Sequence, residues 1–200
     1  GKSGNATDQI LHPGSRLKLE SGRLEAKFSS GVRCVIDAPC ELIVIGEKYV
    51  QIKQGLAWFH VTPQAHGFKV ETRRLQIIDH GTEFGVIAGS DGKDEIHVTK
   101  GSVEAASRKS GKPGKAQILL AGQARKITAA GELIQTTLRN SLFPTQLFHP
   151  LAIRNTNFDT PLILAAKKGH RAVVMFLSGY DRHCQMVLGS SGAAGQYHSR

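Results

Sequence analysis

The acidic side chains between residues 79 and 95 are the first place where this sequence could do chemistry. A pair of carboxyl groups can act as general acid and base in hydrolysis, and five acids fall in this stretch: Asp79, Glu83, Asp91, Asp94 and Glu95. The Asp-Gly step at 91–92 favours a type I′ hairpin turn between two flanking strands. We therefore expect a turn here, and a hydrolase that uses Asp91 is the weakest of three functional hypotheses.

Motifs of the common catalytic and cofactor sites do not occur in the sequence. It contains no Gly-x-Ser-x-Gly, no P-loop and no Gly-x-Gly-x-x-Gly. Its nine histidines are scattered without a His-x-His or His-x-x-x-His pair, and there is no Cys-x-x-Cys. We expect neither an enzyme nor a bound metal or cofactor.

Three cysteines leave two alternatives open. Cys34 and Cys40 could form a disulfide between neighbouring strands in an oxidising compartment, or both could be buried free thiols. Cys184 stays unpaired in either case.

Positive charge is in excess along the chain. The 26 Lys and Arg residues against 16 Asp and Glu give a formal net charge of +10, which suits nucleic acid, an anionic membrane or an acidic protein surface. The densest run is Arg108, Lys109, Lys112 and Lys115, and its Ser, Gly and Pro neighbours predict an exposed loop between two late strands. Because no aromatic side chains interleave with this run, we expect no nucleic-acid partner.

The elements that must position these groups are short strands. Apolar residues alternate with polar ones, and Gly, Asp and Pro interrupt the alternation at close intervals. The expected strands are 23–28, 32–37, 40–45, 49–53, 57–62, 68–72, 75–79, 83–88, 95–99, 102–106 and 118–121. This density of strands predicts an all-β sandwich or a solenoid-like domain.

An internal repeat supports the all-β prediction. The form h-x-h-x-x-Gly-x-h-x-h, where h is apolar, occurs three times, centred on Gly22, Gly55 and Gly101. We interpret each copy as strand, tight turn, strand, because glycine supplies the positive φ that a short turn needs.

The last part of the chain has a different pattern. Apolar residues from Thr160 to Leu177 have helical spacing and resemble the two helices of one ankyrin repeat. Alternatively, Asn155 to Pro161 resembles the opening of a carbohydrate-binding-like jelly roll, which would make this segment a truncated second domain. We expect a flexible lead-in at 1–16, a β domain at 17–134, a connector at 135–159, a helical hairpin or truncated domain at 160–188 and a flexible tail at 189–200.

Several short motifs of the β segment together resemble the FecR family. They are Ala38-Pro39, Val50-x-Ile52-x-x-Gly55, Trp58-Phe59-x-Val61, Phe68-x-Val70-x-Thr72, Gly81-Thr82-x-Phe84-x-Val86, Val98-x-x-Gly101-x-Val103 and Leu120-Ala-Gly122-Gln123. The Gly-Thr-x-Phe-x-Val element is the most specific, and the resemblance covers residues 17–130.

This resemblance implies a signalling module without a cofactor. FecR family members are extracytoplasmic parts of membrane signal transducers that control a sigma factor, and they sense the signalling domain of a TonB-dependent receptor by direct protein contact. The family likeness thus implies a periplasmic domain, tethered to the inner membrane in the full-length protein and linked to iron transport or cell-surface signalling. The chain begins at Gly1, with no signal peptide and no apolar run of 18 residues, so we expect a mature or excised piece.

Trp58 is the residue we single out for contact with a partner. On an alternating strand, Trp58 and Phe59 point to opposite faces, so Trp58 is either an exposed anchor or buried on a second face of the sandwich. For the glycines of the motifs, Gly22, Gly55, Gly81, Gly101 and Gly122, we expect turn positions. The rival function is a secreted or surface-anchored, carbohydrate-binding-like module that uses the β domain as a scaffold.

Overall fold

The protein is described by a computed structural model that covers residues 13–21, 23–28, 30–91 and 93–145. It also gives the backbone path of four later strands, 150–153, 162–165, 170–176 and 186–190. No α-helix occurs in these ranges; the regular structure consists of strands and two short 3-10 turns, Pro63–Ala65 and Asn140–Leu142. Within them, no helix is long and apolar enough to cross a membrane.

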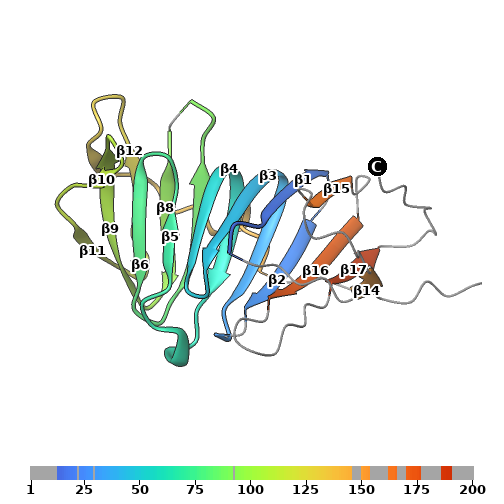
Figure 1. Cartoon of the computed structure of the whole chain (residues 1–200). Coiled ribbons are helices and arrows are strands. Elements are labelled where there is room, and N and C mark those ends of the chain that lie inside the picture. Colours follow the sequence, from blue (N-terminus) through green and yellow to red (C-terminus); the bar gives the residue numbers. More distant parts are fainter. Residues whose placement is uncertain are drawn as a thin grey trace, which may run out of the picture.

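Seventeen strands follow one another along the chain (Figure 1). Their bounds are β1 Arg16–Ser21, β2 Arg23–Phe28, β3 Arg33–Gly46, β4 Tyr49–His60, β5 Lys69–Glu71, β6 Leu75–Asp79, β7 Glu83–Ala88, β8 Glu95–Lys100, β9 Ser102–Lys109, β10 Lys112–Pro113, β11 Gln117–Leu120, β12 Ala124–Ile127, β13 Leu133–Gln135, β14 Pro150–Ile153, β15 Leu162–Ala165, β16 His170–Phe176 and β17 Met186–Ser190. The all-β fold class is confirmed.

The strands form one sheet that curls over itself (Figure 1). Pairing defines a first row, β15-β1-β3-β4-β5-β6-β9-β11, and a second row, β16-β2-β3-β4-β7-β8-β12-β13. Both rows contain β3 and β4, because the two halves of each of these long strands pair with different neighbours.

The main hydrophobic core lies between the two rows. It takes Ile52 and Ile77 from the first row and Phe59, Phe84 and Val98 from the second, all fully buried. The rings of Phe59 and Phe84 stack with centroids 5.2 Å apart. Alternate residues of strands such as β6, β7 and β8 fill this core, as the period of two predicts.

Strands β3 and β4 show where turn signals in the sequence mislead. Ala38-Pro39 and Gly55 suggested that each region contained two strands, but both strands run through these residues with irregular register. The Ala38–Pro39 peptide is cis, and Gly55 has φ +111°. These residues bend a strand without ending it, because both halves keep their partners on either side of the bend.

The repeated glycine motif marks crossings between the two rows. The strands on either side of Gly101, β8 and β9, pair with other strands and not with each other. The same holds for β1 and β2, although Gly22 itself lies outside the described residues. The interpretation of each repeat as a hairpin is therefore wrong. At these points the chain leaves a strand of one row and enters a strand of the other row.

The expected helices between residues 160 and 177 are also wrong. Leu162–Ala165 and His170–Phe176 are strands that pair in parallel with β1 and β2. Helical spacing was misleading because Leu, Ile and Val in short apolar runs suit a sheet as well as a helix. Thr160, Pro161 and Gly169, and the segment Asn155–Pro161 of the carbohydrate-binding alternative, lie outside the described residues.

Candidate functional site: a basic cleft

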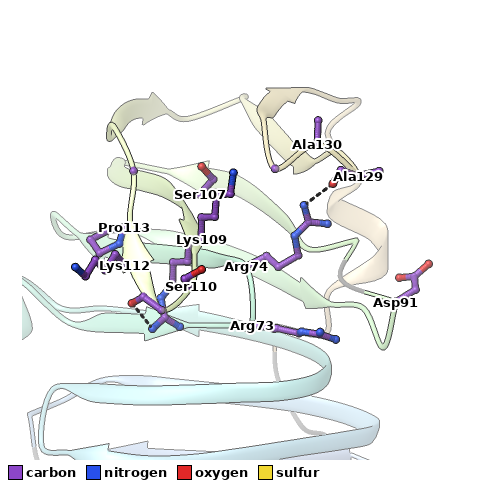
Figure 2. Close-up of a pocket in the computed structure, with 14 residues that line it drawn as sticks. Arg73, Arg74, Asp91, Ser107, Lys109, Ser110, Lys112, Pro113, Ala129 and Ala130 are labelled. Atoms are coloured by element: carbon purple, nitrogen blue, oxygen red, sulfur yellow. Dashed lines mark hydrogen bonds between the residues drawn. The ribbon is translucent and has the colours of Figure 1, made fainter.

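A cleft of about 840 Å³ opens where four connecting segments of the sheet come together (Figure 2). The β5–β6 turn, the β7–β8 hairpin, the β9–β10 hairpin and the loop after β12 line it. The lining residues are Arg73, Arg74, Asp91, Ser107, Arg108, Lys109, Ser110, Gly111, Lys112, Pro113, Gly114, Ala129, Ala130 and Gly131. Five of these side chains are basic and one is acidic, so the cleft is suited to an anionic ligand.

The β9–β10 hairpin presents the basic run of the sequence to the cleft. Lys109 and Lys112 face each other in the hairpin register. Ser110 and Gly111 form its tip with φ values of +51° and +79°, a conformation that the short turn requires. The amide of Gly114 donates to Ser107 O at 2.7 Å and closes the base of the hairpin. The expected exposed loop is therefore an ordered wall of the cleft.

Arg74 joins two walls of the cleft. Its Nη2 donates to Thr128 O at 2.7 Å. The same atom donates to Ala129 O at 3.0 Å (Figure 2). Its own carbonyl accepts from the amide of Arg108 at 2.7 Å. The side chain thus ties the β5–β6 turn to the loop after β12, while the backbone ties that turn to β9.

A buried carboxylate fixes the position of this turn. Asp94 is fully buried, and its Oδ2 accepts from the amide of Arg74 at 2.9 Å and from the Thr72 hydroxyl. Its Oδ1 accepts from the amide of Gly89 at 3.1 Å. One side chain of the second row therefore holds the β5–β6 turn of the first row, and charge-assisted bonds to backbone amides are strong.

The charge of Arg108 is already matched inside the fold. Its Nη2 lies 3.1 Å from Glu71 Oε2, and its Nη1 donates to Thr72 O at 2.9 Å. Burial alone would raise the pKa of Glu71, but hydrogen bonds from Tyr49 and Lys69 and the charge of Arg108 lower it below its ordinary value. Glu71 is therefore an anion that balances the basic side chains around it.

Arg73, Lys109 and Lys112 supply the unmatched positive charge of the cleft. All three are exposed, and none forms an ion pair within the part of the chain that the structure describes. The acid of the lining, Asp91, lies 2.6 Å from Lys93 Nζ. The hydrogen bond from Lys93 holds the pKa of Asp91 below its ordinary value, so Asp91 is ionised and engaged with a lysine outside the lining.

Trp58 lies outside this cleft and is buried. Only 3% of it is exposed, which excludes an exposed anchor and agrees with burial on a second face. It forms a small outer cluster with Val35 and Phe143. Phe143 fits over Gly85, where an added Cβ would lie 2.4 Å from its ring.

The segment that carries Phe143 is held to the outer face of β8. The amide of Arg139 donates to His97 Nδ1 at 3.3 Å, and His97 Nε2 lies 2.9 Å from Glu95 Oε2. Burial lowers the pKa of His97, which favours the neutral ring that can accept this bond. Residues 139–143 of the expected connector therefore pack against the β domain and cover Trp58.

The motif glycines serve the fold. Gly55 packs against the β3 bend, and Gly101 packs against Gly81, with an added Cβ 2.5 Å from Gly81 O. Gly81 and Gly122 have positive φ values of +88° and +87° and open space around them. Phe84 and Val86 of the Gly-Thr-x-Phe-x-Val element are fully buried core residues.

The five acids that suggested a hydrolase do not come together. Asp94 is buried and holds the β5–β6 turn through the amide of Arg74. Asp91 pairs with Lys93. Glu95 contacts His97 and Arg139. The other two lie at the turn before β7, where Glu83 contacts His60 and Asp79 accepts from the amide of Gly81. In the described ranges, no three His, Cys, Asp or Glu side chains are placed to hold a metal ion.

Cys34 and Cys40 are buried free thiols on one strand, β3. Burial raises the pKa of Cys34 well above its ordinary value and that of Cys40 to about 12. Both thiols are therefore protonated and unreactive at neutral pH. The structure agrees with the second of the two alternatives; Cys184 lies outside the described residues.

Sequence reasoning found only half of the cleft. The run from Arg108 to Lys115 stood out by charge density, but nothing linked it to Arg73 and Arg74, which lie about 35 positions earlier. An Arg-Arg pair in a tight turn between two expected strands was the signal available. Only the pairing of β6 with β9 brings the two basic segments together.

Part of this chain is similar to one protein family and to solved structures of one fold. Residues 15–104 match the model of the family described as FecR protein. No curated protein matches the chain. Two crystal structures of a "putative anti-sigma factor" from Parabacteroides distasonis ATCC 8503 have TM-scores of 0.53 and 0.52 and 17% sequence identity with this chain.

These likenesses cover part of each protein. The shared region is 62% of this chain and 60% of the solved chains, so the chain spans less than two thirds of their length. At 17% identity the similarity shows the fold. The basic cleft includes residues 107–114 and 129–131, which lie beyond the family match.

Proposed function

Because residues 15–104 are a FecR domain, we propose that this chain is the sensing part of a regulator that controls a sigma factor through protein–protein contact. The family match is the observation that supports this proposal most strongly. The fold similarity to a protein named as an anti-sigma factor candidate agrees with it. A regulatory role needs no catalytic group, and the dispersed acids of the described residues suit such a role.

The finer part of the proposal concerns location and partner. Here the chain works in the periplasm, tethered to the inner membrane in its full-length form, and its partner is the signalling domain of a TonB-dependent receptor. A compact sheet domain can recognise such a partner with strand edges and surface charge.

A binding experiment tests this function directly. The purified chain is titrated by calorimetry against the periplasmic signalling domains of the TonB-dependent receptors from the same genome. Saturable binding to one of them, together with a change in sigma-factor-dependent reporter transcription when the gene is deleted, is the expected result. Absence of binding to every receptor domain and an unchanged reporter would contradict the proposal.

The same preparation tests the rival function. Retention on polysaccharide resins, with no receptor binding, would favour a surface-anchored carbohydrate-binding module. The cleft does not support that module, because none of its lining residues is an aromatic side chain of the kind on which sugar rings pack.

A further inference from the structure

We infer that the basic cleft and the neighbouring edge of β11 together bind an extended, carboxylate-rich segment of the protein partner. The inference rests on the regulatory function proposed above and names the surface that carries it out. Three features of the described residues support it: the charge of the cleft, its lack of aromatic side chains and its continuity with an open strand edge.

Charge complementarity selects an anionic ligand. Arg73, Lys109 and Lys112 form no ion pair within the described ranges, and the acid of the lining, Asp91, is already bound by Lys93. A planar guanidinium such as that of Arg73 matches a carboxylate with two parallel hydrogen bonds. The Arg74 and Asp94 contacts fix the backbone of the turn that carries Arg73, so the turn is already in position before the ligand arrives.

The absence of aromatic residues argues against single-stranded nucleic acid as the ligand. The fourteen lining residues include no Phe, Tyr, Trp or His. Single-stranded nucleic acid is held by bases stacked on aromatic rings as well as by phosphate contacts. Carboxylate side chains need only charge and hydrogen-bond donors, which this cleft supplies.

Strand β11 extends the surface toward a protein segment. It pairs with β9 on one side and with no described strand on the other. Ile118 and Leu120 are 65% and 56% exposed on its outer face. Such an edge can accept an additional strand through backbone hydrogen bonds, with its apolar side chains as contacts.

The two surfaces are continuous through β9. Residues 102–105 of β9 pair with β11, and residues 107–109 of the same strand line the cleft. A partner strand that lies along β11 would therefore reach the cations at the end of β9. The ligand that fits is a segment with alternating apolar residues followed by Asp or Glu.

A labelled peptide tests the inference without a known partner. The probe is a fluorescein-labelled peptide of alternating Val and Glu followed by a run of Glu, and its anisotropy is measured with the full chain at low and physiological ionic strength. The cleft variant carries Arg73→Glu, Lys109→Glu and Lys112→Glu. The control variant carries Lys18→Glu, Lys27→Glu and Lys100→Glu, which change the net charge equally at exposed positions on β1, β2 and β8.

We expect the cleft variant to weaken peptide binding by about tenfold or more, and the control to change it far less, because salt-screened charges act mainly at short range. Ile118→Ser should weaken binding with little change in its salt dependence. Circular dichroism and the thermal midpoint show whether both triple variants are folded. If charge reversal prevents folding, the cleft variant is made instead with Arg73→Gln, Lys109→Gln and Lys112→Gln.

Three results would overturn the inference: equal loss in the cleft and control variants, no binding of the acidic peptide by the wild-type chain, or cleft-dependent binding of phosphatidylglycerol vesicles in place of the peptide. The last result would assign the cleft to a membrane surface. If a receptor domain binds the cleft variant as well as the wild type, the docking surface is wrong and the proposed function stands. If no receptor domain binds, the peptide titration still decides what the cleft does.

Discussion

Gly55 gives the sharpest test of how the curled sheet is built. Alanine at this position would have to adopt φ +111°, and its Cβ would lie 2.5 Å from Pro39 O and 2.6 Å from Cys40 Cα. The neighbouring atoms belong to the backbone of the β3 bend, so a side-chain rotation cannot relieve the contact. At Gly122 an alanine would be destabilising only through the positive φ of +87°, because no atom lies within 4 Å of the added Cβ.

The difference between these two variants isolates the steric contribution. Positive φ costs an L-residue about 1–2 kcal/mol, and overpacking against a fixed neighbour costs about 1–3 kcal/mol more. We therefore expect a loss of unfolding free energy of about 4 kcal/mol for Gly55→Ala and about 1–2 kcal/mol for Gly122→Ala. Gly101→Ala should resemble Gly55→Ala, because its Cβ would lie 2.5 Å from Gly81 O.

Urea unfolding followed by the fluorescence of Trp58, which is the single tryptophan of the chain, measures these losses. With a slope of roughly 2 kcal/mol per M, the two variants should differ in midpoint by about 1 M urea. Complete loss of the cooperative transition in Gly55→Ala would fit the same reasoning. Equal midpoints for Gly55→Ala and Gly122→Ala would refute it, since the bend at Pro39 could then not be packed against Gly55.

Three other predictions follow from buried groups. Asp94→Ala should lower the unfolding free energy by about 2–4 kcal/mol, because the amides of Gly89 and Arg74 lose their acceptor. In the same urea titration, Asp91→Ala should change the unfolding free energy by about 0.5 kcal/mol or less, because Asp91 is exposed. Phe143→Ala should uncover Trp58, so the tryptophan emission should shift to the red and acrylamide should quench it more strongly. The control is Leu142→Ala, because Leu142 is exposed. Identical quenching in both variants would contradict the packing of Phe143 on Trp58. Burial raises the pKa of Asp79 to about 6, while the amide of Gly81 and the charge of His66 lower it in part. At Asp79 the folded state then binds more protons than the unfolded state between pH 4 and 6, so this group's contribution to stability should fall by at most about 3 kcal/mol as pH rises through this window. Because Glu71 and Asp91 have lowered pKa values and act in the opposite direction, the measured quantity is the stability of the wild type minus that of Asp79→Asn. This difference should fall as pH rises from 4 to 6, and a difference that instead rises would show the sign to be wrong.

Sequence patterns were sufficient for local structure where the alternation of residues is regular. Strands 75–79 and 83–88 were expected with the bounds that β6 and β7 have, because a period of two over five or six residues buries one face in any sheet. The family likeness was available for the same reason: Phe84, Val86 and Val98 occupy core positions whose spacing depends only on the strand.

Patterns failed where a residue type has two uses. Pro39 and Gly55 end many strands, and here they bend one, since the neighbouring strands on both sides keep each half paired. The charge density of residues 108–115 showed that anions could bind, but it did not show an ordered hairpin opposite Arg73. Trp58 could face solvent or a second layer, and the choice depended on residues 139–143, which follow it by about 80 positions.

The sequence by itself therefore determined the fold class, the core positions, the excess of positive charge and the likeness of residues 15–104 to the FecR family. These depend on interactions between residues that are close along the chain, or on composition. Only the tertiary structure decided that the chain crosses repeatedly between the two rows of the curled sheet, that Trp58 is covered, and that two basic segments share one cleft. Each of these depends on which strands pair, and strand pairing is set by contacts between residues far apart in the chain, which local patterns do not encode.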